Sequence, residues 1–318
     1  MTRFILKRLG MGLITLFLLS VIVFWATTIL PSNPGRAIAG PFASEATVKA
    51  INHDLGTDRP IITQYRDWIG GVLHGDLGES YAQKRPVSDM LKDALGNSIK
   101  LAVLAFILVV PLGIFGGVAS ALNEGKWLDR LITVGGLSAA VMPEFVGGIV
   151  LLSIFALWLG WLPVSAAWPP GTSGVEQIKY LLLPAMALTL VLFGYIARIT
   201  RSGTVEVLHS DYTRTAYLKG LPRRTVILRH VLRNSLLPTI AVVATQTGYL
   251  IGGLVVVERL FNYSGVGLML FNATHQKDYP VIESSVLLIG VVYLLATLTA
   301  DILSAVLNPR IRVGSDAG

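Results

Sequence analysis

A long apolar run near the amino terminus, uninterrupted by any charge, constrains this chain more than any other feature. It extends from Leu9 to Leu30 and follows the basic residues Arg3, Lys7 and Arg8. A helix needs about 20 apolar residues to cross a bilayer, whereas the apolar core of a cleaved signal peptide has about 7 to 15. We therefore expect a first transmembrane helix whose basic end stays in the cytosol.

Five further apolar runs follow, and each is expected to form a transmembrane helix. They cover residues 101–122, 131–159, 180–199, 236–257 and 284–307, and the second of these is interrupted at Met142-Pro143-Glu144. Only 14% of the 318 residues are charged, against roughly a quarter in soluble domains. The sequence therefore predicts an all-α integral membrane protein with six spans.

The basic residues lie mostly in short loops at the ends of these spans. Between Arg198 and Arg233 there are eight Arg or Lys residues, and the acidic residues are only Glu206 and Asp211. Short basic loops stay in the cytosol, so this loop and both chain ends are expected there. The net charge of +7 thus reflects membrane topology and does not indicate nucleic-acid binding.

The polar residues also predict the domain organisation. After the amino-terminal tail and first helix of residues 1–30, residues 31–98 carry seven basic and eight acidic residues and are expected to form an external segment. Residues 99–310 would form a five-helix core that includes the cytosolic loop 200–235. Residues 311–318 would form a carboxy-terminal tail.

A basic helix-turn-helix is predicted within the cytosolic loop, over Asp211–Pro238. Gly220 suits the left-handed position that follows a first short helix, and Pro222 suits the first turn of a second. In the second helix, an apolar strip that includes Ile227 and Leu228 lies beside several arginines. A surface of this kind is suited to docking in a groove of another protein.

Several motifs in this chain resemble one family of membrane proteins. Arg214-Thr215-Ala216, Gly220 and Leu236-Leu237-Pro238 resemble the EAA loop of ABC importer permeases, although Arg214 and Thr215 replace the Glu and first Ala of the general motif. The stretches DYTRTAYLKGL and HVLRNSLLP are similar to the form of this loop in dipeptide, oligopeptide and nickel importers. The stretches DLGTDRP, GDLGES, ERLFNYSGVG and NPRIR resemble B-type permease subunits of those importers.

The resemblance implies a type I ABC importer permease fold in the bacterial plasma (inner) membrane, with both termini cytosolic. The chain would form half of a pathway for di- or oligopeptides, beside a second, C-type permease subunit. Two ATPase subunits or domains and an external substrate-binding protein would complete the transporter. Nickel or another small solute is the alternative cargo.

No catalytic function is expected of the chain itself. It has no G-x-x-x-x-G-K-[ST] phosphate loop, so ATP and Mg²⁺ would bind the partner ATPases and no cofactor is expected here. The sequence has no cysteine, and His53 and His74 are lone residues, so no metal site is predicted.

The family's loop is the element that couples the permease to its ATPases, which implies a set of coupling residues. They are Tyr212, Arg214, Thr215, Ala216, Lys219, Gly220, Leu221, Arg224 and Arg229. Candidates for the pathway are Glu144, Gln246 and Asp301, because polar groups inside spans are costly unless they face protein or water. Glu144 is equally compatible with capping a kink, and Asp301 with pairing to an arginine at the inner end.

A proton-coupled secondary transporter is the rival class. Glu144 and Asp301 would then act as an ionisable relay. This hypothesis leaves the basic two-helix loop unexplained, and the sequence does not show the inverted repeat that many such carriers contain.

Overall fold

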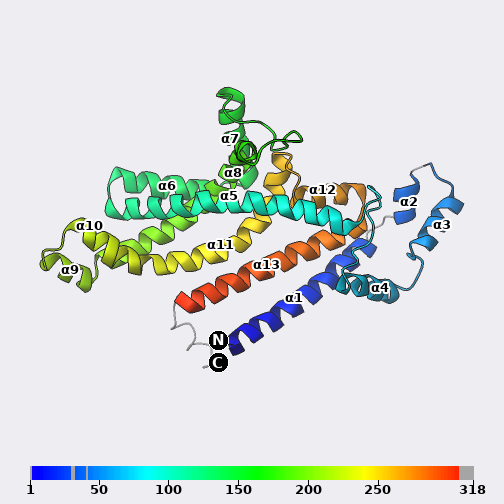
Figure 1. The fold of residues 1–318 in the computed structure, drawn as a ribbon, viewed down its shortest axis with the longest axis horizontal. Coiled ribbons are helices and arrows are strands. Elements are labelled where there is room, and N and C mark those ends of the chain that lie inside the picture. The colour runs from blue at the N-terminus through cyan, green and yellow to red at the C-terminus, as the bar shows by residue number, and fades with distance from the viewer. Residues whose placement is uncertain (1, 30–32, 41, 308–318) are drawn as a thin grey trace. The chain divides into compact units, whose positions relative to one another are not determined.

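The computed structural model describes residues 2–29, 33–40 and 42–307 (Figure 1). The NPRIR stretch and the predicted tail 311–318 lie outside these residues. The chain divides into two compact units. Among the described residues, the core unit comprises Lys100–Tyr263 and residues 295–307, and the amino-terminal unit comprises Thr2–Ile99 and Ser264–Leu294.

Within the described residues the structure is helical apart from loops and an isolated β-bridge between Glu79 and Pro86. The helices are α1 Thr2–Ile29, α2 Pro34–Ala39, α3 Glu45–Asp54, α4 Ile61–Leu73, α5 Val87–Leu122, α6 Trp127–Val141, α7 Glu144–Leu151, η1 Leu152–Trp158, α8 Gly174–Leu208, α9 Asp211–Leu218, α10 Arg223–Thr225, η2 Val226–Val231, α11 Leu232–Leu260, α12 Val266–Gln276 and α13 Tyr279–Leu307. Five of the described helices can cross a membrane by length and composition, or six if the bent pair formed by α6 and α7–η1 counts as one span.

Five of the six predicted spans coincide with one helix each, and most of these helices are longer than their apolar runs. The helix expected from residue 101 begins at Val87, and the one expected over 180–199 extends from Gly174 to Leu208. A capping box sets the start of α8, since the Ser173 hydroxyl accepts from the Glu176 N–H and the Glu176 carboxylate accepts from the Ser173 N–H. Local capping therefore decides this helix end.

The third span is broken at the predicted position. Helix α6 ends at Val141, α7 begins at Glu144, and the two are bent by 113°. Met142 has an extended backbone with ψ 130°, as expected for the residue before a proline. The sequence predicted one span with a local interruption, whereas the structure has two helices that run in different directions.

Small residues allow the helices of the core unit to approach closely. A Cβ atom on Gly113 would lie 2.6 Å from Ile196, and one on Gly117 would lie 2.5 Å from the carbonyl oxygen of Ala197. Both glycines are on α5 and both neighbours on α8. Small residues four positions apart on a helix allow a neighbouring helix to approach closely in this way.

Helices α6 and α8 approach so closely that a single methyl group would separate them. Gly194→Ala is expected to destabilise the core unit by about 1 to 3 kcal/mol, because the added Cβ would collide with the carbonyl oxygen of Gly136. Gly135→Ala is the matched control, since a Cβ there meets no atom within 4 Å. Thermal unfolding in detergent compares the two variants, and equal midpoints would contradict this contact.

In the amino-terminal unit, α1 packs against α13 and α4. Leucine side chains of the opposite helix lie beside Gly12 of α1 and Gly290 of α13. The ring of Phe24 lies 5.4 Å from that of Tyr65 and 5.5 Å from that of Trp68, both on α4. The external segment is thus attached to the first span by aromatic packing.

The loop before α5 is held by one carboxylate. Asp278 accepts from the Ser80 hydroxyl at 2.5 Å and from the backbone N–H groups of Tyr81 at 3.0 Å and Ala82 at 3.2 Å. Asp278 is 2% exposed, and these donors satisfy a charge that burial alone would make costly. The start of α13 and the loop before α5 therefore form one structural element.

Candidate functional site

Helix α9, the first helix of the predicted coupling loop, is defined at both ends by local hydrogen bonds. At its start, Ser210 Oγ and Thr213 Oγ1 donate to the Val207 carbonyl at 2.6 and 2.8 Å. At its end, Gly220 N–H donates to the Tyr217 carbonyl and Leu221 N–H to the Ala216 carbonyl. These two bonds form a Schellman motif, which satisfies the last carbonyls of the helix.

Gly220 occupies the left-handed region of that motif, with φ +73°. This confirms the conformation predicted from the sequence. A residue with a Cβ is strained in this region, whereas glycine adopts it readily. Gly220 therefore permits the chain to reverse between α9 and α10.

The second half of the loop differs from the prediction. Pro222 is the residue before α10 and not its first helical residue, and α10 continues through η2 into α11 without a break. No glycine or proline lies between Arg223 and Arg233 to end the helix. The predicted second short helix is thus the cytosolic end of the long helix that reaches Leu260.

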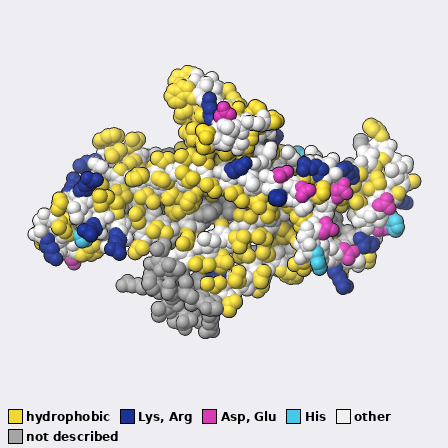
Figure 2. Space-filling model, in the orientation of Figure 1, with side chains coloured by type: hydrophobic (Ala, Val, Ile, Leu, Met, Phe, Trp, Pro, Cys, Tyr) yellow, Lys and Arg dark blue, Asp and Glu magenta, His cyan; other side chains and the backbone are white. Residues whose placement is uncertain are grey.

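Most of the candidate coupling residues lie on the surface. Those that are exposed are Tyr212, Arg214, Thr215, Lys219, Gly220, Arg224 and Arg229. Basic side chains gather over α9 and α10 (Figure 2). The surface of the loop is therefore positively charged.

Two of the candidates, Ala216 and Leu221, are not on the surface of the loop. Ala216 is 5% exposed and packs with Val226 and Val231, and the partly buried Leu221 joins them. Ala216 therefore faces the interior of the helical hairpin and is not displayed on its surface. It can affect a partner only by holding α9 against η2.

An open hollow of about 510 Å³ lies at the start of the second helix. It is lined by Arg223, Arg224, Ile227 and Leu228. The first two side chains contribute positive charge and the other two contribute apolar surface. This arrangement is complementary to a partner that presents apolar and acidic groups together.

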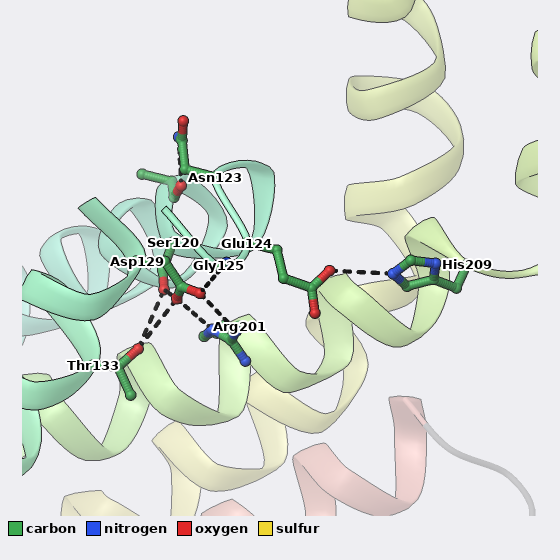
Figure 3. Close-up of polar contacts among 9 residues, drawn as sticks. Ser120, Asn123, Glu124, Gly125, Asp129, Thr133, Arg201 and His209 are labelled. Atoms are coloured by element: carbon green, nitrogen blue, oxygen red, sulfur yellow. Dashed lines mark hydrogen bonds and ion pairs between the residues drawn. The ribbon is translucent and has the colours of Figure 1, made fainter. Parts of the chain in front are cut away.

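A buried ion pair lies beside the loop, and the sequence analysis did not predict it (Figure 3). Arg201 Nε donates to Asp129 Oδ1 at 2.6 Å and its terminal nitrogen donates to Oδ2 at 2.8 Å. Ser120 Oγ and the backbone N–H of Gly125 also donate to this carboxylate, at 2.5 and 2.9 Å. Such bidentate pairing fixes the geometry of both side chains.

The ion pair joins three helices at the ends that the sequence predicts to be cytosolic. Ser120 belongs to α5, Asp129 to α6 and Arg201 to α8. A second link lies nearby, where His209 Nε2 and a Glu124 carboxylate oxygen are 3.2 Å apart. The turn between α5 and α6 therefore holds the end of α8, two residues before α9 begins.

The other end of the coupling loop is also anchored to α8. Thr204 Oγ1 lies 3.4 Å from Ser235 Oγ, and Thr239 Oγ1 lies 3.1 Å from Thr200 Oγ1. The backbone of Gly203 approaches the Ser235 carbonyl so closely that a Cβ would lie 2.7 Å away. Movement of the loop must consequently move α8 and α11 together.

The pathway candidates lie on three different helices. Glu144 is the first residue of α7, Gln246 is within α11 and Asp301 is within α13, and each side chain is partly buried. The position of Glu144 in a first helical turn is compatible with the capping alternative. The pathway assignment of all three stays a prediction. Within the described chain, no group of three or more His, Asp or Glu residues has metal-binding geometry.

Comparison with known protein families covers nearly the whole chain. Residues 91–313 match the family described as the binding-protein-dependent transport system inner membrane component. Residues 1–102 match the amino-terminal region of such membrane components. Because the two matches overlap, they account for both the external segment and the helices that follow it.

Individual relatives extend over the same length. The glutathione transport system permease protein GsiC of Escherichia coli (strain K12) is 36% identical over 313 residues, which is 98% of this chain and 99% of the relative. GsiC of Salmonella typhimurium (strain LT2) is 37% identical over 313 residues, which is again 98% of this chain and 99% of the relative. A crystal structure of an amino acid ABC transporter with histidines is 15% identical with a TM-score of 0.51, and the match covers 70% of this chain and 94% of that one. At that identity the structural match demonstrates a shared fold.

Proposed function

Since the chain belongs to the family of binding-protein-dependent transport system inner membrane components, we propose that it forms half of a membrane pathway for small peptides. It is a non-catalytic, multi-span permease subunit of an ABC importer of the inner membrane. ATPase and binding-protein partners follow from this membership. The proposal adds the peptide cargo, a second permease subunit and two ATPase subunits or domains.

The whole-length similarity to GsiC carries the peptide assignment. Those relatives are permeases of glutathione transport systems, and glutathione is itself a short peptide. The loop stretches DYTRTAYLKGL and HVLRNSLLP support the same assignment, because they resemble the loops of dipeptide and oligopeptide importers. Nickel or another small solute is the alternative cargo.

The geometry of the loop supports a mechanism for energy coupling. Tyr212, Arg214 and Arg224 are exposed and would occupy a groove on an ATPase subunit. A shift of that groove during ATP hydrolysis would displace α9. The anchors between α8 and α11 would then carry the displacement into the spans, since packed helices move as rigid elements.

Reconstitution with the partner ATPases and the binding protein tests the proposal. We expect uptake of labelled dipeptides or glutathione into proteoliposomes to require both ATP and the binding protein. Mass spectrometry of the ligand retained by the purified binding protein should identify a peptide. Uptake of nickel chelates without peptide uptake would overturn the cargo assignment.

A further inference from the structure

A cavity of about 720 Å³ lies in the amino-terminal unit. Aromatic rings of Phe24 at the end of α1, Trp68 on α4, Tyr81 in the loop before α5 and Tyr279 at the start of α13 contribute to its wall. Its volume is in the range of small-ligand sites. None of its lining residues is among the coupling or pathway candidates.

Glu283 is the most unusual group in this wall. It is 6% exposed, and its Oε1 accepts from the Thr27 hydroxyl at 2.6 Å. Within the described part of the chain, this carboxylate forms no ion pair with a cationic side chain. A buried carboxylate is costly unless a positive group compensates it. A cationic ligand would provide that compensation.

The remaining charges of the wall are also negative on balance. Asp67 is paired with Arg59, with 2.8 Å between Oδ2 and a guanidinium nitrogen. Asp76 accepts from a neutral donor, the Gly78 N–H, at 2.9 Å, and the described residues place no cation on it. The charged groups that line the cavity are therefore three carboxylates, those of Asp67, Asp76 and Glu283, and one guanidinium. This balance attracts a cation and disfavours an anion.

Aromatic rings complete the chemistry. Faces of Trp, Tyr and Phe attract ammonium groups, and this attraction strengthens when water is excluded. Burial raises the pKa of the Tyr81 phenol above its usual value, and the charge of Glu283 adds to the rise. Tyr81 therefore stays neutral and contributes no competing charge.

We propose that this cavity binds the primary ammonium group of a small ligand, with Glu283 as its counter-ion. A free peptide amino terminus and the ethanolamine head group of a phospholipid both carry such a group. The cavity lies at the end of α1 opposite its basic residues, so under the predicted topology it opens on the outer side.

The first experiment titrates the full chain in nanodiscs whose only lipid is phosphatidylcholine, because this lipid has no primary amine. Dialanine and N-acetyl-dialanine are compared by calorimetry. We expect acetylation, which removes the ammonium group, to weaken binding roughly tenfold or more. Glu283→Gln should cause a similar loss, because it keeps the hydrogen bond to Thr27 and removes the charge.

The second arm tests the lipid source. Native mass spectrometry of the chain in mixed phosphatidylethanolamine and phosphatidylcholine counts the ethanolamine lipids retained, and Glu283→Gln should lose one. In both arms Asp93→Asn is the control, since this carboxylate of α5 belongs to the same unit and its side chain is 76% exposed.

Each outcome decides the proposal. Loss of dialanine binding in Glu283→Gln assigns the site to a peptide amino terminus, and loss of a retained ethanolamine lipid assigns it to a head group. If neither ligand depends on Glu283 while Asp93→Asn and Glu283→Gln unfold at the same temperature, the ammonium site does not exist. A cargo other than peptide would leave the lipid arm intact, so the two proposals can fail separately.

Discussion

Replacing Asp129 with alanine is expected to destabilise the protein by about 3 kcal/mol and to reduce transport even in the fraction that folds. Removing one partner of a buried ion pair typically costs about 3 to 5 kcal/mol. The lower end applies because the Arg201 side chain is 28% exposed and water can reach it. Thermal unfolding in detergent and uptake in proteoliposomes measure the two effects.

Glu124→Ala is the matched control for this variant. Glu124 lies in the same turn and contacts His209, but its side chain is 46% exposed, and exposed pairs contribute about 0 to 1 kcal/mol. The double variant Asp129→Ala/Arg201→Ala should be little worse than Asp129→Ala alone, because the two residues act as one unit. If Asp129→Ala unfolds at the same temperature as Glu124→Ala, the pair does not hold these helices together.

The sequence could not predict this ion pair, because its members are distant and look ordinary. Asp129 stands between Lys126 and Arg130, where a carboxylate resembles a solvated loop charge. Arg201 was interpreted as a marker of cytosolic topology. One feature of the sequence could have indicated the pair. Both residues lie at the predicted cytosolic ends of spans, where a buried charge needs a partner.

The spans themselves were predictable from hydropathy, because the bilayer requires long apolar helices. The left-handed conformation of Gly220 was also predicted correctly, and Gly113 and Gly117 depend on the same property of glycine. Their roles depend on the absence of a side chain, which the sequence displays directly. A close approach at four-residue spacing and a left-handed helix end each need that absence.

Helix ends were predicted less well, since hydropathy reports where a helix meets lipid and not where it stops. The first turns of α5 contain Asp89, Lys92 and Asp93, which resemble a polar loop. They form the exposed side of a helical extension whose other side, with Met90 and Leu91, is buried. The same limit explains the second half of the coupling loop. Arginines near Leu232 suggested a separate cytosolic helix, whereas η2 joins α10 to α11.

The amino-terminal unit shows a limit of a different kind. The sequence suggested that residues 31–98 form an external segment of their own. The structure groups them with α1 and with Ser264–Leu294, through contacts such as Phe24 with Tyr65 and Ser80 with Asp278. These pairs are up to 198 positions apart. No local pattern reveals contacts between such distant residues.

Gly220→Val is expected to reduce ATP-driven uptake at least roughly tenfold, which corresponds to about 1.4 kcal/mol in coupling. No atom lies within 4 Å of a Cβ at this position, so the effect comes from the backbone alone. The left-handed conformation costs a residue with a Cβ about 1 to 2 kcal/mol, and a β-branched side chain is a genuine outlier there. The chain can relieve this strain by opening the Schellman motif.

An opened motif would displace Leu221 from Ala216 and turn α9 away from η2. The exposed groups on α9 would then leave the orientation that an ATPase groove requires, and docking depends on a few anchors. Uptake and co-purification of the ATPase subunits, measured on the same preparations, should both decrease. Membrane insertion should not change, because the spans keep their apolar runs.

Two substitutions separate this effect from general backbone strain. Gly160→Val imposes the same kind of strain, since Gly160 has φ +64° and no atom within 4 Å of its Cβ, but it lies outside the coupling loop and should leave ATPase binding intact. Gly220→Asn should transport far better than Gly220→Val, because asparagine tolerates the left-handed region. Normal uptake by Gly220→Val with ATPase subunits bound as in the wild type would show that this loop is not the coupling element.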